Sequence, residues 1–383
     1  MLTSVMKASI IGAAILLLFF HLAEKKNRIL KTVVFSLGIL ALDFLIYYGV
    51  WRGNNAVNIV DKNLMLFVFW MPLLYAEPLM ESSPSTKKKI FRIYLLFFSV
   101  ELITTLIGNL MFPMASRDLA STQDIIQNRL YQMMNIGGYG FIYALVLSLP
   151  IWIYLSKFIN KNYIFYVLFS LGVIAVASYM TAIALALLTI VVSLARTPKR
   201  AIIWGAMMMI VFFVSENFLA GWLNNLSEVL YSSDNHILGE RISNISTAVF
   251  SGETTGDMGY RDELRNSSFE AFWSSPLYGN LLGSYKTLGL HSEFVDWLGG
   301  MGIFGVFFAI IVLQNRIRRY ISDFKKTRMS FYVKTMFLVC FVLGFLNLIT
   351  TAPEFSTALF VLPVLLMSIT TQQKEKIVNI KRL

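Results

Sequence analysis

Residues 140–156 read GFIYALVLSLPIWIYLS, and the first charged residue after them is Lys157. The run is close to the length at which an α-helix crosses the hydrocarbon core of a bilayer, about 20 residues. Hydrocarbon offers no partner to backbone N–H and C=O groups, so a spanning segment is either a helix or a strand of a closed barrel. Apolar residues follow one another here without the alternation of a barrel strand. The stretch therefore predicts a transmembrane helix.

Similar apolar runs recur along the whole chain of 383 residues. Apolar residues make up 56% of the sequence and charged residues 14%, whereas soluble domains have about 45–50% and about 25%. The composition excludes an ordinary soluble protein and predicts an all-α, polytopic integral membrane protein with a single membrane domain. We predict about eleven transmembrane helices, at residues 4–23, 31–50, 64–79, 93–113, 140–156, 162–178, 180–195, 201–219, 292–313, 334–350 and 354–371.

Basic residues are unevenly divided between the two sides of this layout. Of the 33 Lys and Arg residues, 24 lie in one set of alternate loops and nine in the other, although the second set contains more sequence. Cytoplasmic loops carry the excess of Lys and Arg in membrane proteins. The pattern predicts an outer N-terminus, a cytoplasmic C-terminus and a large extracytoplasmic loop at residues 220–291. It also accounts for the formal net charge of +11 without nucleic acid as a partner.

Residues 162–195 decide the orientation of everything that follows them. We expect two short helices that turn near Tyr179. One long helix over the same residues would put the basic segments 196–200 and 316–334 outside, against the charge rule.

The first apolar run is followed by charged residues from Glu24 onward and not by a small-residue cleavage site, so we expect an uncleaved span.

The predicted outer loop at residues 220–291 is long enough to indicate a function of its own. It contains eight acidic residues, four basic residues and two of the three histidines. Residues 261–273 are typical of a helix that lies on the membrane surface, and we expect Leu264, Phe272 and Trp273 to face lipid.

The most specific pattern starts at Arg261 and ends in a glycine-rich apolar run. Its members are Arg261, Pro276, Gly279, His291, Ser292, Glu293, Asp296, Gly299, Gly300, Gly302 and Gly305. The pattern resembles the bacterial O-antigen polymerase and O-antigen ligase superfamily, in which an arginine opens a surface helix, a Pro-x-x-Gly turn follows, and a His-Ser or His-Asn pair leads into a Gly-rich span. The His-Ser-Glu-x-x-Asp form favours the polymerase branch. The predicted spans, orientation and large loop extend the resemblance over the whole chain.

The resemblance implies a membrane glycosyltransferase on the outer face of the bacterial cytoplasmic membrane. Its reaction would polymerise undecaprenyl-diphosphate-linked oligosaccharide repeat units of an O-antigen or a capsular polysaccharide. The implied partners are this lipid-linked glycan, membrane lipid and a chain-length regulator. An O-antigen ligase, which transfers finished glycan to another acceptor, is the first alternative. A transporter or flippase of lipid-linked glycan is the second, but inverted repeats and a pathway of intramembrane charges are expected of it, and the sequence shows neither.

Four arginines are candidates for binding the diphosphate. Arg261 and Arg265 are four residues apart and share one face of a helix, and a guanidinium group binds phosphate oxygens through two parallel hydrogen bonds. The alternative is a solvated pair, in which Asp257 forms a weak surface ion pair with Arg261. Arg129 and Arg241 each precede a glycine by eleven positions, a spacing that also resembles polymerases of this superfamily.

His291 is the candidate general base, because an imidazole exchanges a proton near neutral pH and this one lies where the outer loop enters a predicted span. The resemblance to the ligases implies the same role. Glu293 is the alternative base, and Asp296 is the candidate partner that supports either of them. A lone histidine is more often structural than catalytic, so a structural His291 remains the competing interpretation.

Motifs for metal or nucleotide chemistry are absent from the sequence. There is no Asp-x-Asp motif beside the loops, no Cys/His cluster and no Walker-type phosphate loop. We therefore expect neither a metal ion nor a cofactor. The glycines from 299 to 305 are explained by close packing of helices.

Overall fold

The structure of the chain is a computed structural model that describes residues 26–53, 59–112, 115–121, 124–177, 179–195, 216–232, 256–282, 285–325 and 327–367, with the isolated positions 203, 236, 239, 240, 242 and 243. Every regular element is a helix, and the described residues contain no strand. The predicted all-α fold is confirmed. The span predicted at 4–23, most of the span predicted at 201–219, and Arg241 lie outside the described residues.

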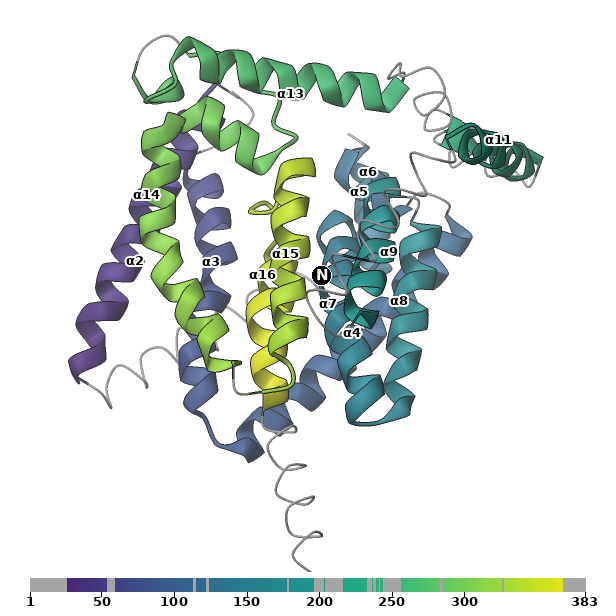
Figure 1. The fold of residues 1–383 in the computed structure, drawn as a ribbon, viewed down its shortest axis with the longest axis horizontal. Helices are drawn as coiled ribbons and strands as arrows, with labels where there is room; N and C mark the ends of the chain where they lie inside the picture. Colours follow the sequence, from purple (N-terminus) through teal and green to yellow (C-terminus); the bar gives the residue numbers. More distant parts are fainter. Residues whose placement is uncertain are drawn as a thin grey trace, which may run out of the picture.

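Helices of different lengths stand side by side in a bundle (Figure 1). In chain order they are α2 (Lys26–Ile46), α3 (Ile59–Glu81), α4 (Pro84–Met111), α7 (Tyr139–Phe158), α8 (Ile164–Val176), α9 (Met180–Leu194), α14 (Glu293–Asp323), α15 (Ser330–Leu346) and α16 (Pro353–Ser356). Two of them continue as π-helical turns, α2 into η1 (Tyr47–Trp51) and α16 into η4 (Thr357–Val361).

Shorter helices gather at the upper end of the bundle in the view of Figure 1. They are α5 (Ala115–Ser121), α6 (Ile125–Met133) and α11 (Glu216–Ser232). α13 (Gly256–Ser274) runs across this end of the bundle (Figure 1). The surface helix expected at residues 261–273 falls within α13.

Within the part of the chain that the structure describes, four helical segments are long and apolar enough to cross a membrane, as judged by length and composition. They are Val33–Trp51, α4, α7 and α14. Shorter apolar helices are α8, α9, α15 and the segment Pro353–Met367, which begins with α16. α8 and α9 are separated by a break between Val176 and Met180, where the sequence predicts the turn.

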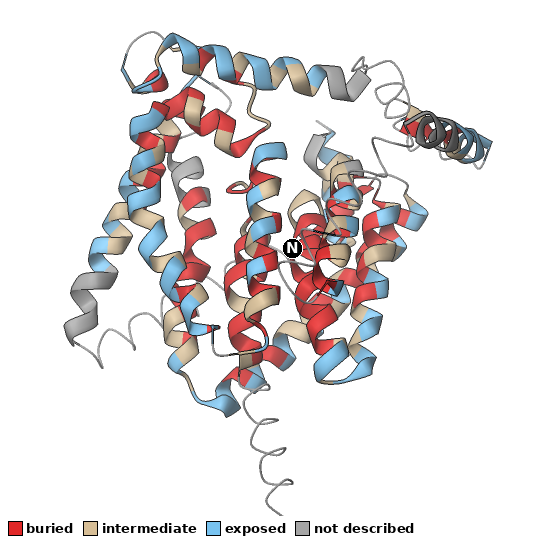
Figure 2. Ribbon diagram, in the orientation of Figure 1, coloured by how far each residue is buried: buried red, intermediate tan, exposed pale blue. Residues whose placement is uncertain are grey.

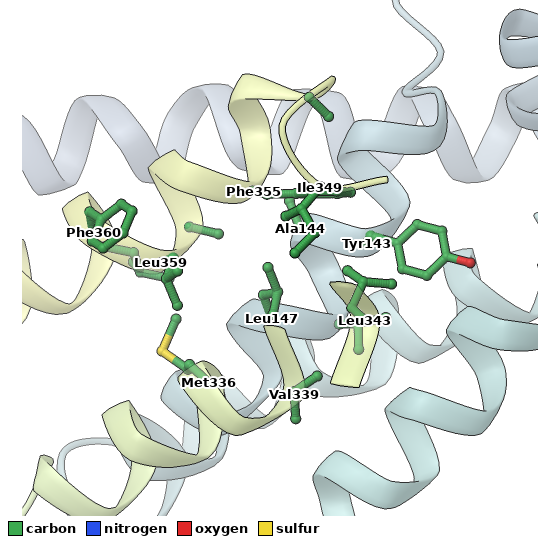
Figure 3. Close-up of a cluster of buried hydrophobic side chains, with 14 of the residues drawn as sticks. Tyr143, Ala144, Leu147, Met336, Val339, Leu343, Ile349, Phe355, Leu359 and Phe360 are labelled. Atoms are coloured by element: carbon green, nitrogen blue, oxygen red, sulfur yellow. The ribbon is translucent and has the colours of Figure 1, made fainter. Parts of the chain in front are cut away.

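α7 forms the centre of the bundle and is buried continuously from Phe141 to Leu155. It packs against α8, α9, α15 and α16. Figure 3 shows Tyr143 at the edge of the apolar cluster that joins α7 to α15 and to α16 with η4, with its hydroxyl oxygen pointing away from the cluster. A helix that is apolar on every side is stable where other helices or lipid surround it. Residues 140–156 are apolar on every side, which is why α7 lies at the centre of the bundle.

The outer faces of the bundle are apolar, which is unusual for a protein surrounded by water. Large apolar side chains point outward from the peripheral helices, where Figure 2 shows exposed positions along their lengths. Leu37 on α2, Leu96 on α4, Phe165 on α8 and Phe307 on α14 are between 60% and 63% exposed. Such a surface matches a hydrocarbon surrounding.

α14 is interrupted at Gly302, where φ is 64°. Its first part runs beneath α13 and the remainder runs down the bundle (Figure 1). At the interruption the N–H groups of Ile303 and Phe304 donate to the carbonyls of Pro276 and Leu277, at 2.9 and 3.0 Å. The residues predicted as one straight span at 292–313 therefore form two helical pieces, because the turn after α13 supplies the acceptors that a continuous helix would otherwise provide.

Candidate functional site

The predicted site residues that the structure describes lie on the helices and loops at the end of the bundle covered by α13 (Figure 1). Arg261 and Arg265 are on α13, and Arg129 is on α6. His291 lies in the loop that leads into α14, and Glu293 and Asp296 are in the first turn of α14.

Arg261 connects α13 to the bundle beneath it. Its side chain is half-buried, and Nη1 donates to the Thr181 hydroxyl at the start of α9, over 3.5 Å. The Tyr143 hydroxyl of α7 lies beside Thr181 and accepts a hydrogen bond of 3.0 Å from the Asn347 side chain. The guanidinium group is thus held over polar groups from two helices and a loop.

A second arginine, Arg117 on α5, acts electrostatically on Tyr179, the residue that precedes α9. Burial raises the pKa of the Tyr179 hydroxyl well above its usual range, and the positive charges of Arg117 and Arg261 act in the opposite direction. Tyr179 itself donates to the Ser116 carbonyl at 2.9 Å. Two cations therefore act on one buried hydroxyl, and the carboxylate of Asp118, next to Arg117, acts against them.

The other predicted arginines have different surroundings. Arg265 forms an ion pair with Asp262 on its own helix, and 43% of its side chain is exposed. Arg129 is exposed on α6. Arg261 and Arg265 were expected to act together because of their spacing, but the structure gives the contact with the bundle to Arg261 and a surface ion pair to Arg265.

His291 lies against the segment of α13 that carries Arg261. Its half-buried ring stands edge-on to the Tyr260 ring, with 6.4 Å between the ring centres. Tyr260 directly precedes Arg261, so neighbouring residues of α13 contact His291 and Thr181. The residue before the histidine, Leu290, has a φ of 55°. Such a conformation is strained by about 1–3 kcal/mol for a branched residue and persists only where surrounding contacts hold it.

Asp296 supplies those contacts. Its Oδ1 accepts from the N–H of Leu290 at 3.3 Å, and its Oδ2 accepts from the N–H of Ser292 at 3.0 Å. These two residues flank His291 on either side. The Ser268 hydroxyl on α13 donates to Oδ1 at 2.6 Å. Asp296 is almost completely buried, and its position fits the supporting role predicted for it, because it fixes the backbone on both sides of the histidine.

Glu293 is buried and fully engaged with the connection between α15 and α16. Its Oε2 accepts from the N–H groups of Ile349 and Thr350 at 2.8 and 3.1 Å. Its Oε1 accepts from the Thr350 hydroxyl at 2.7 Å. Both oxygens therefore already have donors, and the arrangement favours a structural role for Glu293 over that of a base open to substrate.

Glycines bring the backbones of this region together. A Cβ at Gly279, whose φ is 56°, would lie 2.5 Å from the Gly299 carbonyl oxygen, and one at Gly289 would lie 2.0 Å from the Leu264 carbonyl oxygen. No larger side chain fits at either position without displacing backbone. The Pro-x-x-Gly turn and the glycine-rich run thus form one tightly packed support for the loop that carries His291.

Several polar residues of the site were not found from the sequence. Tyr143 and Thr181 lie within apolar runs, where a single hydroxyl carries no recognisable spacing. Asn347 precedes a connection whose partners are far away in the chain. Arg117 had a usable signal, since it is one of only nine basic residues on the predicted outer side.

Among the described residues, no group of three or more His, Cys, Asp and Glu side chains is arranged to hold a metal ion. The chain matches no family model, no curated protein and no solved structure. Its function is therefore inferred from the chemistry of its own residues.

Proposed function

We propose that the protein is a glycosyltransferase of the bacterial cytoplasmic membrane, which polymerises undecaprenyl-diphosphate-linked oligosaccharide repeat units on the outer face. In this proposal about eleven helices cross the bilayer, with the N-terminus outside and the C-terminus in the cytoplasm. The apolar outer faces of α2, α4, α8 and α14 support insertion, and the basic residues between the spans support the orientation.

The observation that carries the proposal is that one segment of α13 carries Arg261 and also contacts His291 through the adjacent Tyr260. Arg261 reaches Thr181 at the bundle end, and Tyr260, its neighbour, contacts His291. A fixed cation beside a group that accepts protons is the pair required for displacement of a diphosphate by a hydroxyl.

The proposed reaction has one displacement step. A hydroxyl of the acceptor sugar attacks the anomeric carbon of the donor glycan, forming the new glycosidic C–O bond. The bond between that carbon and the diphosphate oxygen breaks, and undecaprenyl diphosphate leaves with the bonding electrons. His291 takes the proton of the attacking hydroxyl. No metal is needed for activation, because the diphosphate arrives as a leaving group.

The cations have their largest effect on the leaving diphosphate. Its negative charge grows in the transition state, and fixed donors that meet this growing charge lower the barrier. Arg261 is held between α13 and α9, and Arg117 acts on the same hydroxyl of Tyr179 from α5. In the proposal these two arginines bind the diphosphate, and Arg265 and Arg129 remain at the surface.

The test is incubation of the purified protein with lipid-linked repeat units in detergent, followed by electrophoresis of the glycan. A ladder of products is the expected result. A single transfer to an added lipid or protein acceptor would identify a ligase instead. Movement of labelled substrate across a liposome membrane, without any new glycosidic bond, would identify a transporter. Either of these results would overturn the polymerase proposal.

A further inference from the structure

The short helix α6 lies in the connection between α4 and α7, and one of its sides packs against the protein. Tyr131 on this side is buried, and its ring lies 5.7 Å from the Phe112 ring, measured between centres. The Gln127 side chain donates to the Tyr131 hydroxyl at 2.7 Å. These contacts fix which side of α6 turns toward the bundle.

The other side of α6 is apolar and has no cover among the described residues. Its large side chains, between 45% and 82% exposed, are Ile125, Ile126, Leu130 and Met133. At 3.6 residues per turn these four side chains fall within one arc of about 140° around the helix. We call them the α6 face. Apolar side chains gathered in one exposed patch indicate a contact with something other than water.

Contacts with α4 set the level of α6 along the bundle. The Asn135 side chain donates to the Thr104 hydroxyl at 3.3 Å, and that hydroxyl lies 2.7 Å from the Asn135 carbonyl oxygen. Ile136 packs on Gly108, where a Cβ would lie 2.5 Å from Ile136 Cδ1. Thr104 precedes the end of α4 at Met111 by seven residues, which is about 10 Å of helix. The end of α6 is therefore level with the last turns of α4, a helix long and apolar enough to cross a membrane.

α4 has an apolar surface of its own at this level. Its outward side chains, between 48% and 63% exposed, are Ile103, Ile107, Leu110 and Met111. Thr104, which contacts the segment after α6, borders this surface on the α4 helix. The α6 face and the outer surface of α4 are thus neighbours at one level, and lipid that covers α4 also reaches α6.

The α6 face contains one charge, the exposed side chain of Arg129. Arg129 is four residues from both Ile125 and Met133, so the three side chains lie along one stripe of the helix. An arginine can lay its methylene groups on apolar surface while its guanidinium group stays among polar groups, where it pairs with phosphate oxygens. An apolar helix face with a basic side chain is typical of helices that lie in the boundary between headgroups and acyl chains.

We propose that α6 inserts its apolar face into the outer boundary of the lipid bilayer beside α4, with Arg129 directed to the phosphates of anionic phospholipids. The inference rests on the membrane insertion proposed above and adds a lipid contact to the loop between α4 and α7. It concerns bilayer lipid and is independent of the chemistry at α13.

The experiment measures which solvent surrounds single positions of the full chain in liposomes. In a Cys340→Ala background, Met133→Cys, Gln132→Cys and Leu110→Cys each receive an environment-sensitive fluorophore. Gln132 is the matched polar position, since it is exposed and lies about 100° around the helix from Met133. A lipid that carries a nitroxide near the carbonyl end of its acyl chain quenches labels in the boundary, and iodide quenches labels in water.

Met133→Cys should respond to the lipid quencher as strongly as Leu110→Cys and should be protected from iodide, whereas Gln132→Cys should be open to iodide. Equal access of iodide to Met133→Cys and Gln132→Cys would overturn the proposal. So would protection of Met133→Cys from both quenchers together with disulfide formation between copies, which would show that a second copy covers the face.

The Leu110→Cys label separates this proposal from the membrane insertion on which it rests. If Leu110→Cys is quenched by the lipid and Met133→Cys is not, only the insertion of α6 is wrong. If neither is quenched by the lipid, insertion of the bundle is wrong as well. Failure of the polymerase assay would leave both results unchanged, because the quenching measurement uses no glycan substrate.

Variants of Arg129 test the headgroup contact. A basic side chain near an anionic lipid surface contributes about 1 kcal/mol, so Arg129→Gln should lower the ratio of lipid-exposed to water-exposed Met133→Cys label about fivefold in liposomes that contain phosphatidylglycerol. Arg129→Lys should preserve the ratio, and in pure phosphatidylcholine Arg129→Gln should have a smaller effect. An Arg129→Gln ratio equal to that of the unchanged protein in anionic liposomes would contradict the assignment of Arg129 to anionic headgroups.

Discussion

The Asp296 carboxylate accepts a 2.6 Å hydrogen bond from the Ser268 hydroxyl and so joins the first turn of α14 to the surface helix α13. Ser268 is completely buried and also accepts from the Gly289 N–H at 2.9 Å. Because Asp296 holds the N–H groups on both sides of His291, this one contact connects the surface helix with the backbone of the candidate base.

Ser268→Ala tests the importance of that connection. The substitution leaves the Gly289 N–H without its acceptor and removes one of the two donors to Asp296 Oδ1, and we expect a loss of about 1–3 kcal/mol in stability. We also expect slower glycosyl transfer, because His291 is no longer held in its strained loop. Melting temperature and transfer rate measure the two effects. Ser267→Ala, on the adjacent half-buried hydroxyl that bonds only within α13, should leave the rate near that of the unchanged protein.

His291→Ala removes the proposed base. General-base catalysis typically contributes about a hundredfold or more to a rate, so we expect at least that loss in initial rate, with an unchanged melting temperature. His236→Ala is the matched control, because His236 is exposed and lies on another segment of the same loop. A loss of less than about tenfold in His291→Ala would exclude a general-base role for this residue.

Arg261→Ala removes a cation from the proposed diphosphate site. A hydrogen bond to a charged group is worth about 1.5–3 kcal/mol, so the transfer rate should fall about ten- to a hundredfold while the protein still inserts in the membrane. Arg265→Ala should change the rate by less than about fivefold, because its ion pair with Asp262 is at the surface. Polymer of normal amount and length from Arg261→Ala would remove this arginine from the mechanism.

Glu293→Gln separates the two interpretations of this carboxylate. A glutamine oxygen can still accept from Ile349 and Thr350, and its amide can donate to the Thr350 hydroxyl, so a structural Glu293 predicts nearly full activity. Glu293→Ala should be less stable by about 1–3 kcal/mol for each N–H left unpaired. If Glu293→Gln abolishes transfer without lowering the melting temperature, then Glu293 and not His291 is the base.

The helical character of the fold was predictable because it depends on local properties of the sequence. Continuous apolar runs give helices wherever the structure describes them, and the break between α8 and α9 lies at the predicted turn. The surface helix and the close packing of Gly299 and Gly300 also follow from residue type and spacing.

The interruption at Gly302 and the partners of the site residues were not predictable in the same way. The break depends on carbonyl groups from Pro276 and Leu277, and the environment of Glu293 depends on a connection more than fifty residues away. Such contacts are set by how elements meet in space. The spacing of Arg261 and Arg265 predicts that they share a face of one helix, and both lie on α13. It gives no information about which of them reaches the bundle.

The central claim is that α13 and its arginine face the outside of the cytoplasmic membrane. In a Cys340→Ala background, which removes the single native cysteine, Glu270→Cys places a thiol on an exposed position of α13 and Lys88→Cys places one on an exposed position near the start of α4. A membrane-impermeant maleimide applied to intact spheroplasts should label Glu270→Cys at once and Lys88→Cys only after permeabilisation. The reverse pattern would put Arg261 and His291 in the cytoplasm and contradict the account.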